Sequence, residues 1–208
     1  MLKRILWILF AALAIIIGLY PGVYFIFDRK FGLLASKDDA LLNNIFWNTA
    51  FYIHIVFGGI ALLVGWVQFS NKLRAKNLSL HRTIGKVYVM GVLLSSIAGI
   101  YVALFATGGI ITSLGFLSLG VIWFWTTLTA YFSIRKGKLK QHENSMIYSY
   151  AACFAAVTLR VWLPLLVMIF KDFITAYTIV AWLCWVPNLV VATLIVRERS
   201  FPNISSAV

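Results

Sequence analysis

The chain has 208 residues, of which 62% are hydrophobic and 12% are charged. Soluble domains carry about 45–50% apolar and roughly 25% charged residues. One globular core of this length would leave much apolar surface uncovered, so the composition excludes an ordinary soluble domain and predicts an integral membrane protein. The formal net charge of +12 does not indicate nucleic-acid binding, because the basic residues lie in short clusters between apolar runs.

Six stretches are long and apolar enough to cross a bilayer, which takes about 20 residues of helix. They cover approximately Ile5–Phe27, Ile45–Phe69, Ile84–Ala106, Ile110–Phe132, Met146–Phe170 and Phe173–Val196. The pair Gly108-Gly109 marks a turn between the third and the fourth stretch. We therefore predict an all-α fold, a polytopic bundle of six transmembrane helices that forms a single domain over residues 1–208.

The lysines and arginines outside the membrane divide unequally between the two sides. The side that holds both chain ends carries thirteen, namely Lys3, Arg4, Lys72, Arg74, Lys76, Arg82, Lys86, Arg135, Lys136, Lys138, Lys140, Arg197 and Arg199. The opposite side carries four, namely Arg29, Lys30, Lys37 and Lys171. Loops rich in lysine and arginine stay in the cytoplasm. We therefore predict that both termini are cytoplasmic.

One histidine and one arginine lie deep inside the predicted spans. His54 in the second span and Arg160 in the fifth are each roughly 13–15 Å from the same end of their helices, at about 1.5 Å per residue. Ionisable groups inside a membrane usually face the bundle interior, so the pair indicates a shared polar site. The competing hypothesis is structural. Pro164 cannot donate to the carbonyl of Arg160, which predicts a kink there, with the guanidinium capping freed carbonyls.

The other two histidines, His81 and His142, begin the third and fifth spans in the segments LHRTIG and QHENSM. Steps of four and three residues from each histidine fall on one helix face. These faces are mostly small or polar: His81, Gly85, Tyr88, Val92, Ser95 and Gly99; His142, Met146, Ser149, Cys153, Ala156 and Arg160; His54, Gly58, Ala61, Gly65 and Gln68. Small residues let membrane helices approach closely. We predict a central polar core between the second, third and fifth spans, whether as a packing seam or as a site.

The chain also resembles a known family. The segments YIHIVFGGIALLVGWVQF, LHRTIGKVYV, GFLSLGVIWFWTTLTAY, KQHENSMIYSYA and AAVTLR, which lie between about Phe51 and Arg160, resemble a bacterial family of predicted membrane proteins, domain of unknown function 2306. The resemblance implies the fold and the positions of the site residues, but no activity. Together with the loop charges, the bacterial family predicts the bacterial cytoplasmic (inner) membrane as the location. More loosely, the His-x-x-x-Gly of His81 and Gly85 is similar to the helix starts of cytochrome b561-type haem proteins.

The haem resemblance implies facing histidine ligands. The two-haem pattern needs four histidines and this chain has three, so at most one bis-histidine haem fits, between His81 and His142. The first functional hypothesis is thus a redox or cofactor-binding membrane protein. In it, His81 and His142 hold haem b or a metal ion, and His54 with Arg160 binds an anionic group such as a propionate or a quinone oxygen.

Two alternatives stay open. The first is a small-molecule carrier or ligand-binding protein that uses a His54/Arg160 pocket without a prosthetic group. The second is an accessory subunit of a membrane complex, or a homo-oligomer, whose aromatic residues meet lipid or protein. A hydrolase is not favoured, because no Ser-His-Asp, HExxH or P-loop pattern is apparent and the carboxylates lie outside the spans. Cys153 and Cys184 lie in apolar runs and are expected to be core residues.

Overall fold

The structure is a computed structural model that describes residues 1–27 and 30–200. Arg29, which entered the charge count above, lies outside these residues. The described residues are mostly helical and contain no strand, and six helical stretches are long and apolar enough to span a membrane. They cover Arg4–Phe25, Ile45–Phe69, Leu78–Ala103, Ile110–Arg135, Leu139–Phe170 and Phe173–Arg199. The predicted all-α fold with six spans is confirmed.

Several spans consist of more than one helical segment. The described elements are α1 (Leu2–Leu19), η1 (Tyr20–Phe25), η2 (Gly32–Ser36), α2 (Asp39–Asn43), α3 (Ile45–Gly65), η3 (Trp66–Phe69), α4 (Asn71–Lys76), α5 (Leu78–Ala103), α6 (Ile110–Arg135), α7 (Leu139–Cys153), α8 (Ala155–Phe170), α9 (Phe173–Leu183) and α10 (Val186–Ser200). The Asn77 side chain accepts a hydrogen bond from the backbone of Leu80 and caps α5. His81 therefore lies in the first turns of α5, and His142 likewise lies in the first turns of α7.

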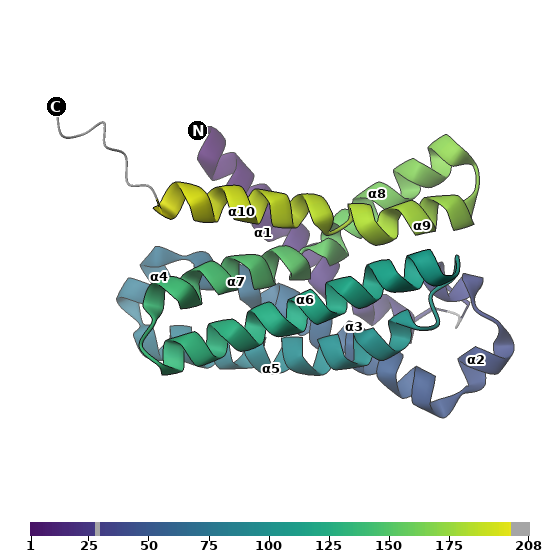
Figure 1. Ribbon diagram of the computed structural model, residues 1–208, viewed down its shortest axis with the longest axis horizontal. Coiled ribbons are helices and arrows are strands. Elements are labelled where there is room, and N and C mark those ends of the chain that lie inside the picture. The colour runs from purple at the N-terminus through teal and green to yellow at the C-terminus, as the bar shows by residue number, and fades with distance from the viewer. Residues whose placement is uncertain (28–29, 201–208) are drawn as a thin grey trace.

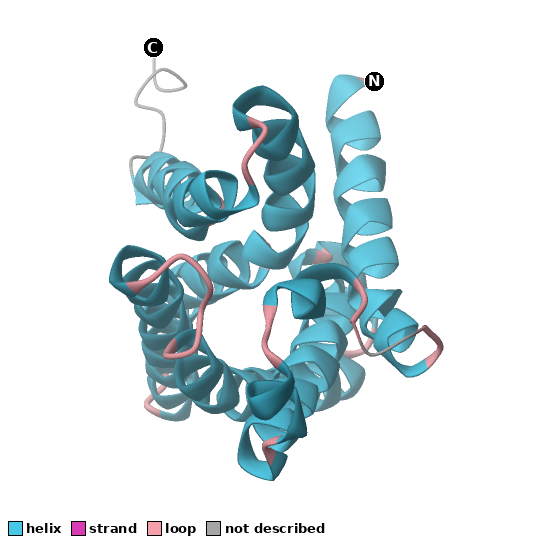
Figure 2. Cartoon of the chain, turned by 90° about the vertical axis from the view of Figure 1, so that its right-hand side faces the viewer, coloured by secondary structure: helices cyan, strands magenta, loops and turns pink. Residues whose placement is uncertain are grey.

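Four helices form the centre of the bundle. α3, α5, α6 and α7 pack in a ring, each against the next (Figure 1). α1 crosses α3, α10 packs on α7, and α9 packs on α6 and α8. Seen along the bundle, the helices surround a common axis (Figure 2). Large apolar side chains such as Trp125, Met168 and Val190 are exposed on the outside, where a bilayer would cover them.

Glycine allows a close approach between the ring and α1. A Cβ on Gly59 would lie 2.6 Å from the carbonyl oxygen of Gly18, so α1 and α3 are nearly in backbone contact. Tyr88, Val92 and Ser95 are fully buried, with 0% exposure, on the face of α5 that the sequence singled out. This face is therefore directed into the bundle.

Two spans are broken at neighbouring positions. The fifth is interrupted at Phe154, between α7 and α8, and the sixth between α9 and α10. Asn188 donates to the carbonyl oxygens of Ala151 (3.2 Å) and Cys184 (3.0 Å), and the Thr158 hydroxyl also donates to Cys184. These side chains satisfy carbonyls that the breaks leave free.

The fifth span is interrupted before Arg160, and α8 continues past Pro164, the residue that predicts a kink. α8 runs from Ala155 to Phe170 with Pro164 inside it, and the interruption lies earlier in the chain, at Phe154. At the interruption, Asn188 supplies a replacement donor for the Ala151 carbonyl, which a regular helix would pair with the amide of Ala155. A side chain from another span thus satisfies the carbonyl that the interruption leaves free.

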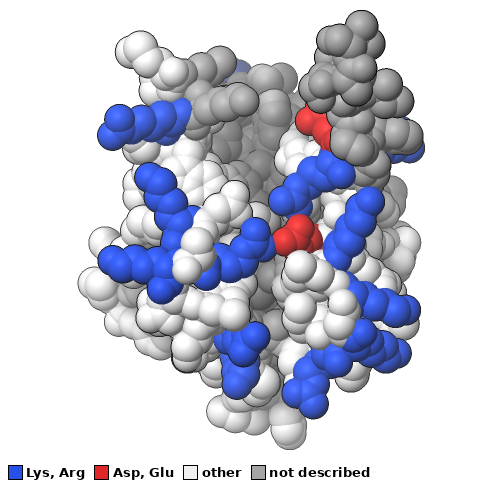
Figure 3. All heavy atoms as spheres, turned by 90° about the vertical axis from the view of Figure 1, so that its left-hand side faces the viewer, with Lys and Arg blue, Asp and Glu red and all other residues white. Residues whose placement is uncertain are grey.

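The two ends of the bundle differ in charge. We call the end that carries α4, the first turns of α5 and α7 and the last turn of α10 the basic end, and the opposite one the far end. Lysine and arginine side chains cover the basic end, with few acidic ones among them (Figure 3). One of these, Glu143, accepts a hydrogen bond from Arg74 at 2.7 Å and lies 3.8 Å from Arg199.

Candidate functional site

A cavity of about 220 Å³ lies between the helices in the half of the bundle near the far end. Most of its wall is apolar, with Trp47, Phe51 and Trp123 among the aromatic side chains. His54 of α3 and Arg160 of α8 both line it. The structure thus brings together the two residues that the sequence placed at one depth.

His54 is held in a defined orientation by α5. Its Nδ1 lies 3.0 Å from the carbonyl oxygen of Ser95, and the Ser95 hydroxyl donates to the His54 carbonyl at 2.8 Å. A carbonyl only accepts, so this contact requires the proton on Nδ1 and leaves Nε2 as an acceptor. A Cβ on Gly99 would lie 2.6 Å from Nδ1, so only glycine at this position leaves room for the imidazole.

Arg160 is a partly buried cation with few partners. Its Nη1 donates to the carbonyl oxygen of Ala156 at 2.8 Å, and its Cζ lies 4.3 Å from the centroid of the Tyr20 ring. Its Nε is buried without a hydrogen-bond partner. Among the described residues, no carboxylate lines the cavity or forms an ion pair with Arg160. The cavity therefore carries an uncompensated positive charge.

Lys37 also lines the cavity, near the far end, although no sequence pattern pointed to it. Its ammonium donates to the carbonyl oxygen of Phe105 and to the Thr107 hydroxyl, the latter at 3.0 Å. The Ser36 and Thr107 hydroxyls also lie 3.0 Å apart. Burial lowers the pKa of Lys37, and the charge of Asp38 opposes that effect. These contacts fasten η2 over the bundle.

A buried hydroxyl chain lies between the cavity and the basic end. The Tyr88 and Ser149 hydroxyls are 2.7 Å apart, and those of Ser149 and Thr127 are 2.6 Å apart. Thr127 also donates to the carbonyl oxygen of Trp123 at 2.8 Å. Tyr88, Thr127 and Ser149 each have 0% exposure. The sequence analysis placed Tyr88 and Ser149 on the small or polar faces of two different helices. It did not predict that the two side chains contact each other across the bundle.

His81 and His142 lie closer to the basic end and do not line the cavity. The two are near enough to interact electrostatically. The Nδ1 of His142 lies 2.9 Å from the carbonyl oxygen of Ala130, which leaves its Nε2 as an acceptor. The Nδ1 of His81 is buried without a hydrogen-bond partner. In the part of the chain that the structure describes, no group of three or more His, Cys, Asp or Glu could hold a metal ion.

Comparison with known proteins places these residues in a family. The model of a family described as predicted membrane protein (DUF2306) matches residues 51–196, which is more than two thirds of the chain. The matched segment contains all three histidines and Arg160. Neither a curated protein nor a solved structure matches the chain.

Proposed function

The chain belongs to the DUF2306 family of predicted membrane proteins, and we propose that it binds an amphipathic, anionic small molecule in the cavity between His54 and Arg160. The single observation that carries this proposal is the state of Arg160. A guanidinium has five N–H donors, and here Nε is buried without a partner while the cavity wall contributes no carboxylate among the described residues. An anionic head group would supply both the missing acceptor and the missing charge.

The cavity wall and volume define the ligand class. The largely apolar wall suits an alkyl or isoprenoid chain, and the polar groups suit a head with carboxylate, sulfonate, phosphate or quinone oxygens. The volume of about 220 Å³ is below the roughly 300–1,000 Å³ of most ligand pockets, so it fits a head group with part of a chain. His54 adds an acceptor at Nε2, which would receive a hydrogen bond from a hydroxyl group of the ligand.

The distribution of charge also supports an orientation. Basic residues gather at one end of the bundle (Figure 3). The described residues contain an even number of spans, which puts both ends of the bundle chain on the same side of the membrane. By the positive-inside rule, the basic end faces the cytoplasm of a bacterial cell, and the cavity lies in the outer half of the cytoplasmic membrane. Alkaline phosphatase fused after Lys171 should be active and the same fusion after Lys136 inactive. The reverse pattern would refute this orientation.

Binding can be measured by tryptophan fluorescence, because Trp47 and Trp123 line the cavity. The detergent-purified protein is titrated with decanesulfonate, a single-chain amphiphile with a permanently ionised head. We expect saturable binding, weakened on the order of tenfold or more in Arg160→Met, because charge-assisted hydrogen bonds contribute about 1.5–3 kcal/mol. Arg82→Met, which removes an exposed arginine outside the cavity, is the matched control. Equal affinity of the two variants would refute the proposal.

A second candidate is a haem b or metal ion held by His81 and His142, which would make the protein a redox component. The observation that favours it is the orientation of His142, since a hydrogen bond from Nδ1 to a backbone carbonyl is how proteins commonly prepare a metal-binding Nε2. The buried, unpartnered Nδ1 of His81 is a second available ligand atom. Haem bound in this way would supply one-electron chemistry.

Absorption spectroscopy and metal analysis of the purified protein test this second candidate. A Soret band, or a stoichiometric metal, that disappears in His142→Ala and persists in His54→Ala is the expected result. Wild-type protein with neither a Soret band nor a bound metal, after expression with haem precursor and metals supplied, would exclude the candidate. That result would leave the ligand-binding proposal intact, because the cavity does not involve these two histidines.

A further inference from the structure

The cavity is elongated along the bundle axis. On α3, the residues that line it extend from Trp47, near the far end, past His54 to Leu62. Trp47 and Leu62 are fifteen positions apart, which is roughly 22 Å of helix at about 1.5 Å per residue. A volume of about 220 Å³ over such a length makes the cavity long and narrow. This shape fits an extended hydrocarbon chain better than a bulky ring system.

The two halves of the cavity differ in polarity. On the far side of His54, the wall includes Lys37, whose ammonium donates to the Thr107 hydroxyl at 3.0 Å. It also includes Trp47, whose buried Nε1 has no hydrogen-bond partner. Hydrogen-bond donors are therefore available from the level of Arg160 outward. We call the other half, which runs from His54 and Arg160 toward the basic end, the inner arm.

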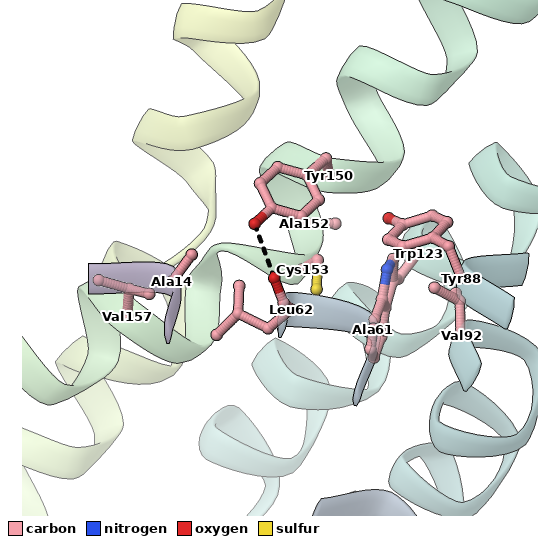
Figure 4. Packing of buried hydrophobic residues seen from close by; sticks show 10 residues of the cluster. All are labelled: Ala14, Ala61, Leu62, Tyr88, Val92, Trp123, Tyr150, Ala152, Cys153 and Val157. Atoms are coloured by element: carbon pink, nitrogen blue, oxygen red, sulfur yellow. Dashed lines mark hydrogen bonds between the residues drawn. The ribbon is translucent and has the colours of Figure 1, made fainter. Parts of the chain in front are cut away.

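The inner arm has an apolar wall. Among the described residues, α3, α6, α7 and α8 contribute only apolar or small side chains to this wall, including Gly58, Leu62, Leu119, Cys153 and Ala156. Trp123 also lines this half, and Figure 4 shows its indole nitrogen directed toward the Tyr88 hydroxyl. A hydrocarbon chain suits such a wall, whereas a charged head placed there would lose its hydration without gaining a partner.

Two counts along the chain give the inner arm the same length. Leu62 lies eight residues past His54 on α3, and Ala152 lies eight residues before Arg160 on α7 and α8. Each count corresponds to roughly 12 Å of helix. An extended chain advances about 1.2 Å per bond, because three bonds of extended peptide backbone span at most about 3.6 Å. The arm is therefore long enough for about ten carbons.

The inner arm ends in the packed centre of the bundle. Leu62 of α3, Trp123 of α6 and Cys153 of α7 belong to one buried cluster, and Figure 4 shows these side chains close together. Tyr150 donates to the backbone carbonyl of Leu62 at 3.0 Å, which holds this part of α3 in place. A chain that reaches the cluster cannot extend further without displacing closely packed side chains.

We infer that the inner arm binds one unbranched hydrocarbon chain of about ten carbons, with the anionic head of the same molecule at Arg160 and the chain end at Leu62 and Cys153. This inference rests on the proposed function and deepens it, because it names the ligand class as a single-chain amphiphile of medium length. The side chains at the end of the arm then select for chain length. A chain that ran in the opposite direction from Arg160 would instead lie beside the ammonium of Lys37.

The test measures binding of n-alkanesulfonates, from butanesulfonate to tetradecanesulfonate, by fluorescence titration of the detergent-purified protein. Partition of a given sulfonate into detergent is the same for all variants. The Kd of each variant is therefore divided by the wild-type Kd for the same sulfonate, and the ratio depends on the protein alone. Each methylene that gains or loses a place in the arm should change this ratio about fourfold, the equivalent of about 0.8 kcal/mol.

Two variants change the length of the arm in opposite directions. Leu62→Ala removes three carbons from its end and leaves space there. We expect this variant to bind dodecanesulfonate more tightly than wild type does, and octanesulfonate no more tightly. Cys153→Leu adds bulk at the end, so it should weaken binding of decanesulfonate and leave that of butanesulfonate unchanged. Leu166→Ala is the matched control, because Leu166 is buried outside the cavity wall and should give one ratio for all chain lengths.

The outcomes distinguish this inference from the proposed function. Wild-type protein that binds decanesulfonate, together with ratios independent of chain length in Leu62→Ala and Cys153→Leu, would overturn the inner arm alone. A dependence on chain length that Phe51→Ala alters and Leu62→Ala does not would place the chain on the far side of His54, and would also overturn it. Cys153→Leu decides if Leu62→Ala does not fold. Absence of binding in wild type across the whole series would overturn the proposed function.

Discussion

The guanidinium of Arg160 lies over the ring of Tyr20, with 4.3 Å between Cζ and the ring centroid. The contact joins α8 to η1, which directly continues α1 within the first span. A cation over an aromatic face gains about 0.5–1 kcal/mol at exposed sites and about 2 when desolvated. The ring thus compensates in part for the missing carboxylate, and it leaves the charge available to a ligand.

This geometry predicts opposite behaviour for two substitutions of Tyr20. Tyr20→Phe keeps an aromatic face and should bind decanesulfonate as the wild type does. Tyr20→Leu removes the face, so the guanidinium loses its orientation and binding should weaken by about three- to tenfold, the equivalent of about 0.7–1.4 kcal/mol. Fluorescence titration measures both. Equal weakening by Phe and Leu would mean that the phenol hydroxyl, and not the ring face, is responsible.

Arg160→Met separates a ligand-binding arginine from a structural one. A buried charge without a paired carboxylate has a desolvation penalty that is not repaid, and methionine keeps an apolar stem of similar reach. We therefore expect the free energy of unfolding to stay within about 1 kcal/mol of wild type or to rise, while decanesulfonate binding weakens about tenfold or more. Thermal unfolding in detergent gives the comparison. A large fall in melting temperature would instead assign Arg160 to capping carbonyls.

Gly99 should be intolerant of even one added methyl group. A Cβ there would lie 2.6 Å from His54 Nδ1, so the imidazole must leave the Ser95 carbonyl or α3 must move away from α5. We expect Gly99→Ala to cost about 1–3 kcal/mol, the usual range for overpacking. Gly22→Ala is the matched control, because a Cβ at Gly22 has no atom within 4 Å. Similar melting temperatures for the two variants would contradict the packing seen at His54.

Local sequence patterns predicted much of this molecule. Apolar runs located the six spans because a bilayer imposes a minimum helix length. Counting residues from one end placed His54 and Arg160 at one depth, and both line one cavity. The predicted starts of the third and fifth spans lie several residues after the observed starts of α5 and α7, because the first turns of these helices are polar and basic. A hydropathy pattern does not register such turns.

The remaining features depend on contacts between distant residues. The break at Phe154 depends on Asn188, which lies on another span, and no residue near Phe154 signals it. The hydrogen bond between Tyr88 and Ser149 requires the ring order of the helices, which periodicity within one helix does not contain. Lys37 seemed an ordinary loop lysine, because its partners Phe105 and Thr107 lie in a different loop.

Lys37 makes a contribution to folding stability that depends on pH. Burial lowers the pKa of its ammonium in the folded protein relative to the unfolded chain. The charged form is therefore disfavoured by folding, and this cost is fully present below the lowered pKa. As pH rises from the lowered pKa to the ordinary lysine value, the folded state loses its proton first and the cost disappears. This group alone thus makes folding more favourable at alkaline pH.

We expect the melting temperature of wild type to gain more, or lose less, between pH 7.5 and pH 10 than that of Lys37→Met, which has no titrating group at this position. The effect should be small, since Lys37 is only partly buried and water screens its charge. Lys76→Met, at the exposed end of α4, corrects for the titration of surface lysines. If Lys37→Met keeps the pH dependence of wild type while Lys76→Met alters it, Lys37 is solvated in the folded protein.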